Sequence, residues 1–220
     1  MQVTRPDGST YEAHAKFAEA AENGRRGLAA EFIASRLAEL LGANVPRAEA
    51  VELRDEPVIK LRNGVTPAPG LAFASETITP WIDVNAADAI TDVPLDQLAL
   101  LSVHESWTEV SDRGHNMIRS HSQVYAIDFA SAFNPAWSGA TGAPNLVDDG
   151  LLRDRLIVEH NAMRTAADRL CGVTDAAIDG AVNDIPADWL DAAAITALRA
   201  RLKANRESVA DQIRAGHPEA

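Results

Sequence analysis

An oxygen-rich loop, followed by a short strand and a second acid, is the feature that most constrains this chain. The stretch at 107–133 reads WTEVSDRGHNMIRSHSQVYAIDFASAF. Its polar part holds Asp112 and Asn116, and the alternating segment 124–127 predicts a short strand that ends at Asp128. Carboxylate and amide oxygens are the ligands that Mg²⁺ takes in proteins, together with phosphate and water. The pattern therefore predicts a site suited to Mg²⁺ and to a substrate hydroxyl.

The same residues resemble the catalytic and metal-binding loops of the HipA-like kinases. The likeness is carried by 111–116 (SDRGHN) and 127–129 (IDF), which are also similar to the D-R-H…N and I-D-F-G pattern of the phosphatidylinositol-kinase-like branch. Phosphoryl transfer in kinases uses one Asp facing the attacking hydroxyl, with an Asn and a second Asp on the metal. The resemblance therefore implies that Asp112 is catalytic and that Asn116 and Asp128 hold Mg²⁺.

Two segments nearer the N-terminus extend this resemblance. Residues 11–17 (YEAHAKF) are similar to the family's strand with the phosphate-binding lysine, which would be Lys16. Residues 27–46 resemble its segment of an acid, an apolar helix, a leucine, a glycine and V-P, with Glu31 at the acidic position. The resemblance implies that Glu31 pairs with Lys16 to position it against the phosphates of ATP.

Two further segments fit the same family. The resemblance makes 73–77 (FASET) the segment that joins the two lobes, where backbone groups at Phe73 and Ala74 would contact the adenine of ATP. The tail, with Trp189 followed by a Leu- and Arg-rich helix to Ile213, is similar to that of small HipA-like proteins. The likeness thus spans most of the chain and implies ATP and Mg²⁺ as cofactors.

The chain departs from the kinase pattern in two places. Asn116 lies four residues after Asp112, where kinases usually have five, so the loop is one residue short. No glycine-rich segment that would cover nucleotide phosphates precedes Lys16, because Asp7-Gly8 is a hairpin turn signal. Either nucleotide binding is reduced in this chain, or such a segment is missing from the N-terminus.

Residue patterns taken without the resemblance leave simpler interpretations open for two site residues. Lys16 on a strand is by default a solvated edge lysine, because edge strands often carry lysine. Glu31 lies opposite the apolar stripe of its helix, which includes Phe32, Leu37 and Leu40, so periodicity alone predicts a solvated side chain. Both interpretations compete with the ion pair that the resemblance implies.

Composition limits the size of the core, the possible partners and the cellular compartment. A chain of 220 residues that is 46% hydrophobic can bury one substantial core or two small lobes. The net charge of −12, with scattered lysines and arginines, argues against a nucleic-acid duplex as a partner. A single cysteine, Cys171, excludes an internal disulfide and fits a reducing compartment. Because neither a signal peptide nor a membrane span is visible, we expect a soluble, cytoplasmic protein.

The predicted elements change character along the chain. The first part predicts a hairpin over 1–17, a helix over 28–41 and short β runs, and the second predicts mainly helices. The β runs lie at 48–53, 57–61 and 70–78, and the later helices at 95–107, 151–170, 175–182 and 187–213. We therefore expect an α+β, two-lobed, protein-kinase-like fold. Residues 1–220 would form one domain, with a β-rich N-terminal lobe over 1–80 and a helical C-terminal lobe over 81–220.

The expected function is transfer of the γ-phosphate of ATP to a hydroxyl acceptor, either a small molecule or Ser or Thr of a protein. Two other classes remain open. One is a kinase-fold module that binds nucleotide or regulates a partner with little or no turnover. The other is a metal-dependent hydrolase, whose nitrogen and oxygen ligands would be His104, His115, His121, Asp112 and Asp128.

Overall fold

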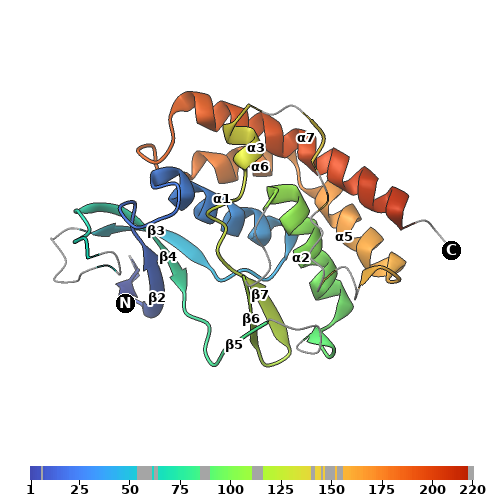
Figure 1. Ribbon diagram of the computed structural model, residues 1–220, viewed down its shortest axis with the longest axis horizontal. Coiled ribbons are helices and arrows are strands. Elements are labelled where there is room, and N and C mark those ends of the chain that lie inside the picture. The colour runs from blue at the N-terminus through green and yellow to red at the C-terminus, as the bar shows by residue number, and fades with distance from the viewer. Residues whose placement is uncertain are drawn as a thin grey trace.

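A computed structural model shows two antiparallel sheets beside a group of helices (Figure 1). It describes residues 1–5, 7–53, 61, 64–84, 90–110, 116–139, 142–144, 146, 152 and 156–217. The larger sheet contains the N-terminus, and the longest helix, near the C-terminus, runs along the opposite side of the molecule. A mixed α and β architecture was expected, and the structure confirms it.

The N-terminal sheet has four strands in the order β1-β2-β4-β3, all antiparallel. They are β1 (Gln2–Thr4), β2 (Thr10–Lys16), β3 (Ala48–Leu53) and β4 (Gly70–Glu76). The expected hairpin is present, since β1 pairs with β2 around a turn in which Gly8 has the positive φ of 84°. The β run expected at 57–61 falls almost entirely outside the described residues.

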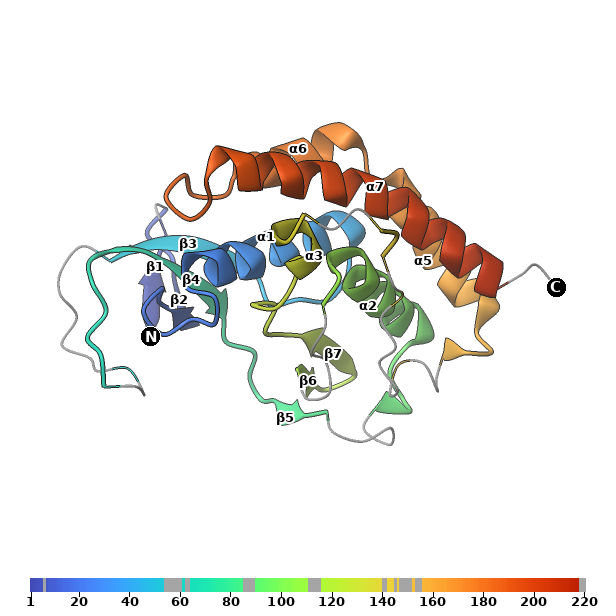
Figure 2. The same ribbon diagram turned by 45° about the horizontal axis from the view of Figure 1, so that its top comes forward.

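Helix α1 (Arg25–Leu41) lies between the N-terminal sheet and the other helices (Figure 2). It ends at Gly42, whose left-handed φ of 78° is the usual helix stop for glycine, as the sequence predicts. The helix contacts β3 and β4 on one side, and α2 and α6 on the other. It is therefore buried around most of its circumference, which an apolar stripe on one face did not indicate.

A second sheet of three short strands follows in the order β5-β6-β7. The strands are β5 (Ile82–Asp83), β6 (Met117–Ser120) and β7 (Gln123–Ala126). Strand β7 corresponds to the strand expected over 124–127. Strands β5 and β6 were not expected, because segments of two and four residues carry too little alternation to stand out. Asp128 follows shortly after the last residue of β7.

The remaining helices form the larger part of the molecule. Helix α7 crosses over the others and contacts α2, α3, α5 and α6 (Figure 2). Their bounds are α2 (Leu95–Thr108), α3 (Asn134–Trp137), α5 (His160–Gly172), α6 (Asp175–Asn183) and α7 (Ala192–Gly216). The four longer ones agree with helices expected from the sequence, although the helix expected over 151–170 is interrupted: residues 152 and 156 are helical, and α5 begins at His160 after a turn. Side chains of Thr174 and Asp191 cap the starts of α6 and α7.

One large apolar core runs from α1 through α2 to α7, and a second is very small. The small one consists of Val3, Ala13 and Ala74 on one face of the N-terminal sheet. Trp107 and Trp189 are buried in the large core, as packing anchors should be, and Trp107 donates its indole N–H to the carbonyl of Leu202 at 2.9 Å. Within the described part of the chain, no helix is long and apolar enough to cross a membrane.

Candidate functional site

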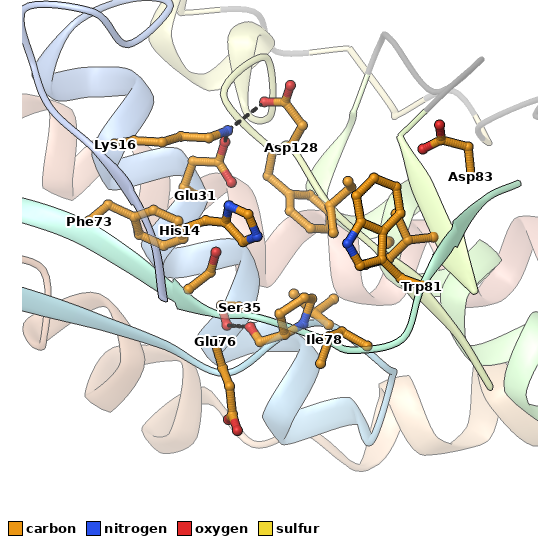
Figure 3. A pocket seen from close by; sticks show the side chains of 17 residues that line it. His14, Lys16, Glu31, Ser35, Phe73, Glu76, Ile78, Trp81, Asp83 and Asp128 are labelled. Carbon is orange, nitrogen blue, oxygen red and sulfur yellow. Dashed lines mark hydrogen bonds and ion pairs between the residues drawn. The ribbon is translucent and has the colours of Figure 1, made fainter. Parts of the chain in front are cut away.

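A cavity of about 280 Å³ opens between the N-terminal sheet, α1 and the end of β7 (Figure 3). Its walls come from segments far apart in the sequence, and they combine apolar side chains with a few charged ones. The charged and polar lining residues include His14, Lys16, Glu31, Ser35, Ser75, Glu76, Asp83 and Asp128. Four of the site residues predicted from the sequence, Lys16, Glu31, Phe73 and Asp128, therefore line one cavity.

Lys16 is the last residue of β2, and its side chain points into this cavity (Figure 3). Its ammonium donates one hydrogen bond to Oε1 of Glu31 and another to Oδ1 of Asp128 at 2.9 Å. The strand places it there because alternate residues share a face, so His14 and Lys16 both line the cavity. Lys16 thus joins a side chain of α1 to a side chain that follows β7.

Glu31 is only 4% exposed, so the solvated position suggested by helical periodicity is wrong. The reason is tertiary: α1 is covered on two sides, and the face opposite its apolar stripe meets the sheet and the segment after β7. A buried carboxylate requires donors or a cation to remain charged. Lys16 supplies the cation, and the backbone of Phe129 supplies a second hydrogen bond.

The charges at this site influence each other's protonation. Burial by itself lowers the pKa of Lys16, but Glu31 and then Asp128 attract the ammonium more strongly, so the pKa of Lys16 lies above its ordinary value. Burial raises the pKa of Glu31, and Lys16 opposes this shift. Lys16 therefore stays positively charged at neutral pH, as a partner for phosphate requires.

Asp128 has a left-handed backbone with a φ of 60°, a conformation that non-glycine residues seldom adopt. The residues on both sides hold it in place. The Ile127 amide donates to the carbonyl of Asn116 at 2.9 Å, and Phe129 is buried with its ring edge-to-face with His104. The carboxylate is 51% exposed and faces the cavity, so it is accessible to a ligand.

The chemistry of two predicted residues suits a magnesium ion, although only Asp128 of the two lines the cavity. Asn116 is close to it along the backbone, because the Asn116 carbonyl accepts from the amide of the residue before Asp128. One carboxylate and one amide oxygen are typical protein ligands for Mg²⁺, which takes its other ligands from phosphate and water. No group of three His, Cys, Asp or Glu side chains within the described ranges is arranged to hold a metal by itself.

Asp112, the predicted catalytic residue, lies outside the described residues, as do Arg113 and His115. The chain on both sides of this loop is well anchored. On the N-terminal side, Glu109 forms an ion pair with Arg201 of α7, with Nε 2.9 Å from Oε2, and Val110 donates to the carbonyl of Glu105. Asn116 anchors the C-terminal side.

Phe73 and Ala74 do not lie in a connecting segment as predicted. Both are inside β4, where Phe73 is opposite Lys16 and Ala50, and Ala74 is opposite residues of β2 and β3. Because strands pair with the backbone of β4 on both sides, that backbone is not available to an adenine edge. The side chain of Phe73 nevertheless lines the cavity.

Sequence reasoning missed the residues that line the cavity after β4. Ile78 and Trp81 both belong to the segment between β4 and β5, and both border the open space (Figure 3). His14, two residues before Lys16 on β2, also lines the cavity and was not assigned to the site. Only the position of β4 could have shown that the chain leaves the sheet after Glu76 and returns past the cavity.

The two described histidines proposed for a hydrolase, His104 and His121, do not come together. His104 is buried in α2, where Nε2 lies 2.8 Å from the carbonyl oxygen of Ala34. His121 lies in the turn between β6 and β7 and lines a different hollow. Neither borders the cavity that contains Asp128. His115 is outside the described residues. The described residues therefore offer no support for a histidine-based metal centre.

A curled antiparallel sheet packed against a larger group of helices is the two-lobed arrangement of kinase-like proteins. Among solved structures, the chain is similar to a Helicobacter pylori proinflammatory kinase, CtkA, with a TM-score of 0.63 and 12% sequence identity. The alignment covers 97% of this chain and 89% of that one, and at this identity it shows the fold alone. A search among curated proteins found no match.

The sequence itself identifies the family. The family model for the HipA-like kinases matches residues 6–216, which is nearly the whole chain. The protein therefore belongs to the HipA-like kinase family.

Proposed function

We propose that this protein is an ATP-dependent, Mg²⁺-requiring kinase that transfers the γ-phosphate to a hydroxyl group. The observation that carries the proposal is the position of Lys16, whose ammonium contacts both buried Glu31 and accessible Asp128 at the wall of one cavity. A kinase site needs a fixed cation for the phosphates beside a carboxylate for the metal. Membership of the HipA-like kinase family supports the same conclusion.

Each residue then has a distinct role in the proposed reaction. Glu31 holds Lys16 in place, and Lys16 neutralises charge on the nucleotide phosphates. Asn116 and Asp128 would hold Mg²⁺, which supplies further neutralisation of phosphate charge. Asp112 accepts or orients the proton of the acceptor hydroxyl. The acceptor oxygen forms a bond to the γ-phosphorus as the bond to the bridging oxygen breaks, leaving ADP and a phosphorylated product.

A binding module without turnover is the second candidate, and one observation favours it. No described residue of the turn between β1 and β2 lines the cavity, so within the described part of the chain nothing from this turn would cover the phosphates. A kinase lacking such a cover would hold the γ-phosphate less tightly and expose it to water. Nucleotide binding with no phosphate transfer would be the result.

The test is transfer of labelled γ-phosphate from ATP to the protein itself and to a cell lysate, with Mg²⁺ present. We expect transfer by the wild type and a loss on the order of 10²–10⁴-fold for Asp112→Asn, typical of losing a general base. Nucleotide affinity should change little in that variant, because the interaction matters mainly in the transition state. Asp128→Asn should instead abolish the Mg²⁺-dependent part of ATP binding.

The outcomes separate the two candidates. Binding of Mg–ATP without transfer to any acceptor selects the binding module. Full activity in Asp112→Asn would mean that the proton acceptor has been assigned to the wrong residue. ATP affinity that is the same for Asp128→Asn and wild type, with Mg²⁺ present, would remove Asp128 from the metal site.

A further inference from the structure

Trp81 differs from the other tryptophans of this chain. Its side chain is 46% exposed, whereas Trp107 and Trp189 are buried and Trp137 packs edge-to-face against Phe133. Among the described residues, the Trp81 ring contacts no other aromatic ring or guanidinium, and its Nε1–H has no hydrogen-bond partner. An indole exposed in this way leaves a large apolar surface in water, which is unfavourable unless a ligand covers it.

The exposed ring of Trp81 borders the cavity as well as the outer surface. Trp81 lines the cavity together with Ile78, Phe73 and Phe129, which make this part of the wall apolar. Figure 3 shows the indole at the right of the open space, away from the ion pair of Lys16 and Asp128 at the top. The cavity thus combines a flat apolar wall with a charged region that suits phosphate and metal.

The backbone around Trp81 is anchored on both sides, so the ring has a defined place. On one side, Thr77 donates its N–H to the carbonyl of Glu12 on β2 at 2.9 Å. On the other, Ile82 belongs to β5 and pairs with Arg119 of β6. Trp81 is therefore held between the two sheets, at the point where the chain passes the cavity.

We propose that Trp81 stacks on the base of the bound nucleotide and so determines how tightly the cavity holds a nucleoside triphosphate compared with phosphate alone. This inference rests on the proposed function, because it takes a nucleotide to be the ligand. A planar base is the part of that ligand that matches a free indole face, since both present π-surfaces that lose contact with water on stacking. The phosphates extend toward Lys16, which carries the complementary charge.

Calorimetric titration of Trp81→Ala with two ligands tests the proposal. The first ligand is Mg²⁺ with a non-hydrolysable ATP analogue, and the second is Mg²⁺ with inorganic tripolyphosphate, which has the charges but no base. We expect Trp81→Ala to weaken the ATP analogue about tenfold, the loss of one base–aromatic stack. Tripolyphosphate should bind wild type and variant equally. Trp81→Phe, which keeps a ring, should stay within about threefold of wild type for both ligands.

Tryptophan fluorescence gives an independent readout. The analogue should change the emission of wild type and of Trp137→Phe, which alters a tryptophan outside the cavity. The same addition should leave the emission of Trp81→Phe nearly unchanged although the analogue still binds.

Three results would overturn the inference: an unchanged affinity of Trp81→Ala for the analogue, an equal loss for tripolyphosphate, or an unchanged fluorescence response in Trp81→Phe. If the wild type binds tripolyphosphate but gains nothing from the nucleoside, Trp81 is also excluded as a base contact. If the wild type binds neither ligand, the proposed function itself fails. That outcome is distinct from a wild type that binds ATP independently of Trp81.

Discussion

The N-terminal sheet adds only Ala48 and Phe73 to the buried residues of the large apolar core and has a small cluster of its own, whereas the helical part supplies most of the large core. The sheet's own cluster consists of Val3, Ala13 and Ala74, whereas the large core runs without interruption from α1 to α7. Yet each region contributes one side of the candidate site: Lys16 comes from the sheet, and Asp128 from the segment that α2 supports through Phe129 and His104. The site therefore joins a thinly packed region to a densely packed one.

This difference shows how the sheet is held in place. With so small a core of its own, the sheet depends on α1, which packs against β3 and β4 and also belongs to the large core. The ion pairs of Lys16 with Glu31 and Asp128 add a polar connection at the cavity. We therefore expect the sheet to open more readily than the helical part, and ligands that bind Lys16 to stabilise it.

The largest expected effect compares the two cores directly. Leu98 of α2 is fully buried in the large core, and Leu98→Ala should lower the free energy of unfolding by about 2–5 kcal/mol, through lost transfer energy and a residual cavity. Val3→Ala, in the small cluster, removes two methyl groups beside few neighbours and should cost about 1 kcal/mol. Urea unfolding measures both. Equal losses would show that the sheet is packed as firmly as the helical part.

A smaller effect is expected where the two regions meet. Lys16→Met leaves the carboxylate of Glu31 buried without its cation, which should lower stability by about 1–3 kcal/mol. The value is below that of a fully buried pair, because Lys16 is 36% exposed and solvent screens its charge. Adding Glu31→Gln to Lys16→Met should recover part of the loss, since a neutral amide is less costly to bury.

Thermal unfolding of the two single variants and the double variant gives the coupling between these side chains. A melting temperature of Lys16→Met equal to that of the wild type would mean that Glu31 is stabilised by other groups. In that case the ion pair does not connect the sheet to α1. ATP binding by the same variant separately tests the proposed role of Lys16 at the phosphates.

A buried asparagine, Asn205, shows where the large core could be made more stable. Its side chain, on α7, is 1% exposed, and neither its amide nitrogen nor its carbonyl oxygen has a hydrogen-bond partner among the described residues. A buried polar group without a partner is unfavourable, so Asn205→Leu should raise stability by about 1 kcal/mol. Asn161→Leu, at an exposed position on α5, is the matched control and should change stability by less than about 0.5 kcal/mol. A loss of stability in Asn205→Leu would indicate that the amide is hydrated inside the core.

The smallest effect concerns the far end of the helical part. Nδ1 of His217, just after α7, lies 3.1 Å from Nδ1 of His160 at the start of α5. Burial and then the charge of His160 lower the pKa of His217 below its ordinary value of 6.5. The native state thus binds this proton less readily than the unfolded chain. The contribution to stability is complete above pH 6.5 and is lost as the pH falls through the lowered pKa.

Melting temperatures at several pH values would measure this contribution. Between about pH 7 and pH 5, the melting temperature of the wild type should fall more steeply than that of His217→Gln, which cannot acquire the charge. If the melting temperatures of wild type and His217→Gln depend on pH in the same way, the contact between the two rings has no influence on the stability of the junction between α5 and α7.

Local patterns predicted much of the fold. The hairpin around Gly8, the end of α1 at Gly42 and the long helices all follow from turn residues, stop signals and apolar spacing, which act over a few neighbouring residues. The shortest elements did not follow, because β5 and β6 are stable only through their pairing with each other and with β7. Pairing between distant segments leaves little trace in such short stretches of sequence.

For the site, the sequence by itself determined which residues could take part. An Asp after a short strand, an Asn in the loop before it and a lysine on an early strand have oxygen and nitrogen groups of the right chemistry wherever the chain folds. Their resemblance to the HipA-like kinases singled them out. Chemistry of this kind belongs to the residue type and the motif, so the amino-acid sequence is enough to reveal it.

Only the tertiary structure decided the surroundings of these residues. It buried Glu31, which periodicity assigned to solvent, because α1 is covered from two directions. It placed Phe73 and Ala74 inside a strand, and brought Trp81 to the cavity that the Phe73 side chain also lines. Burial and proximity depend on how distant segments pack, and a one-dimensional pattern records only the neighbours of a residue along the chain.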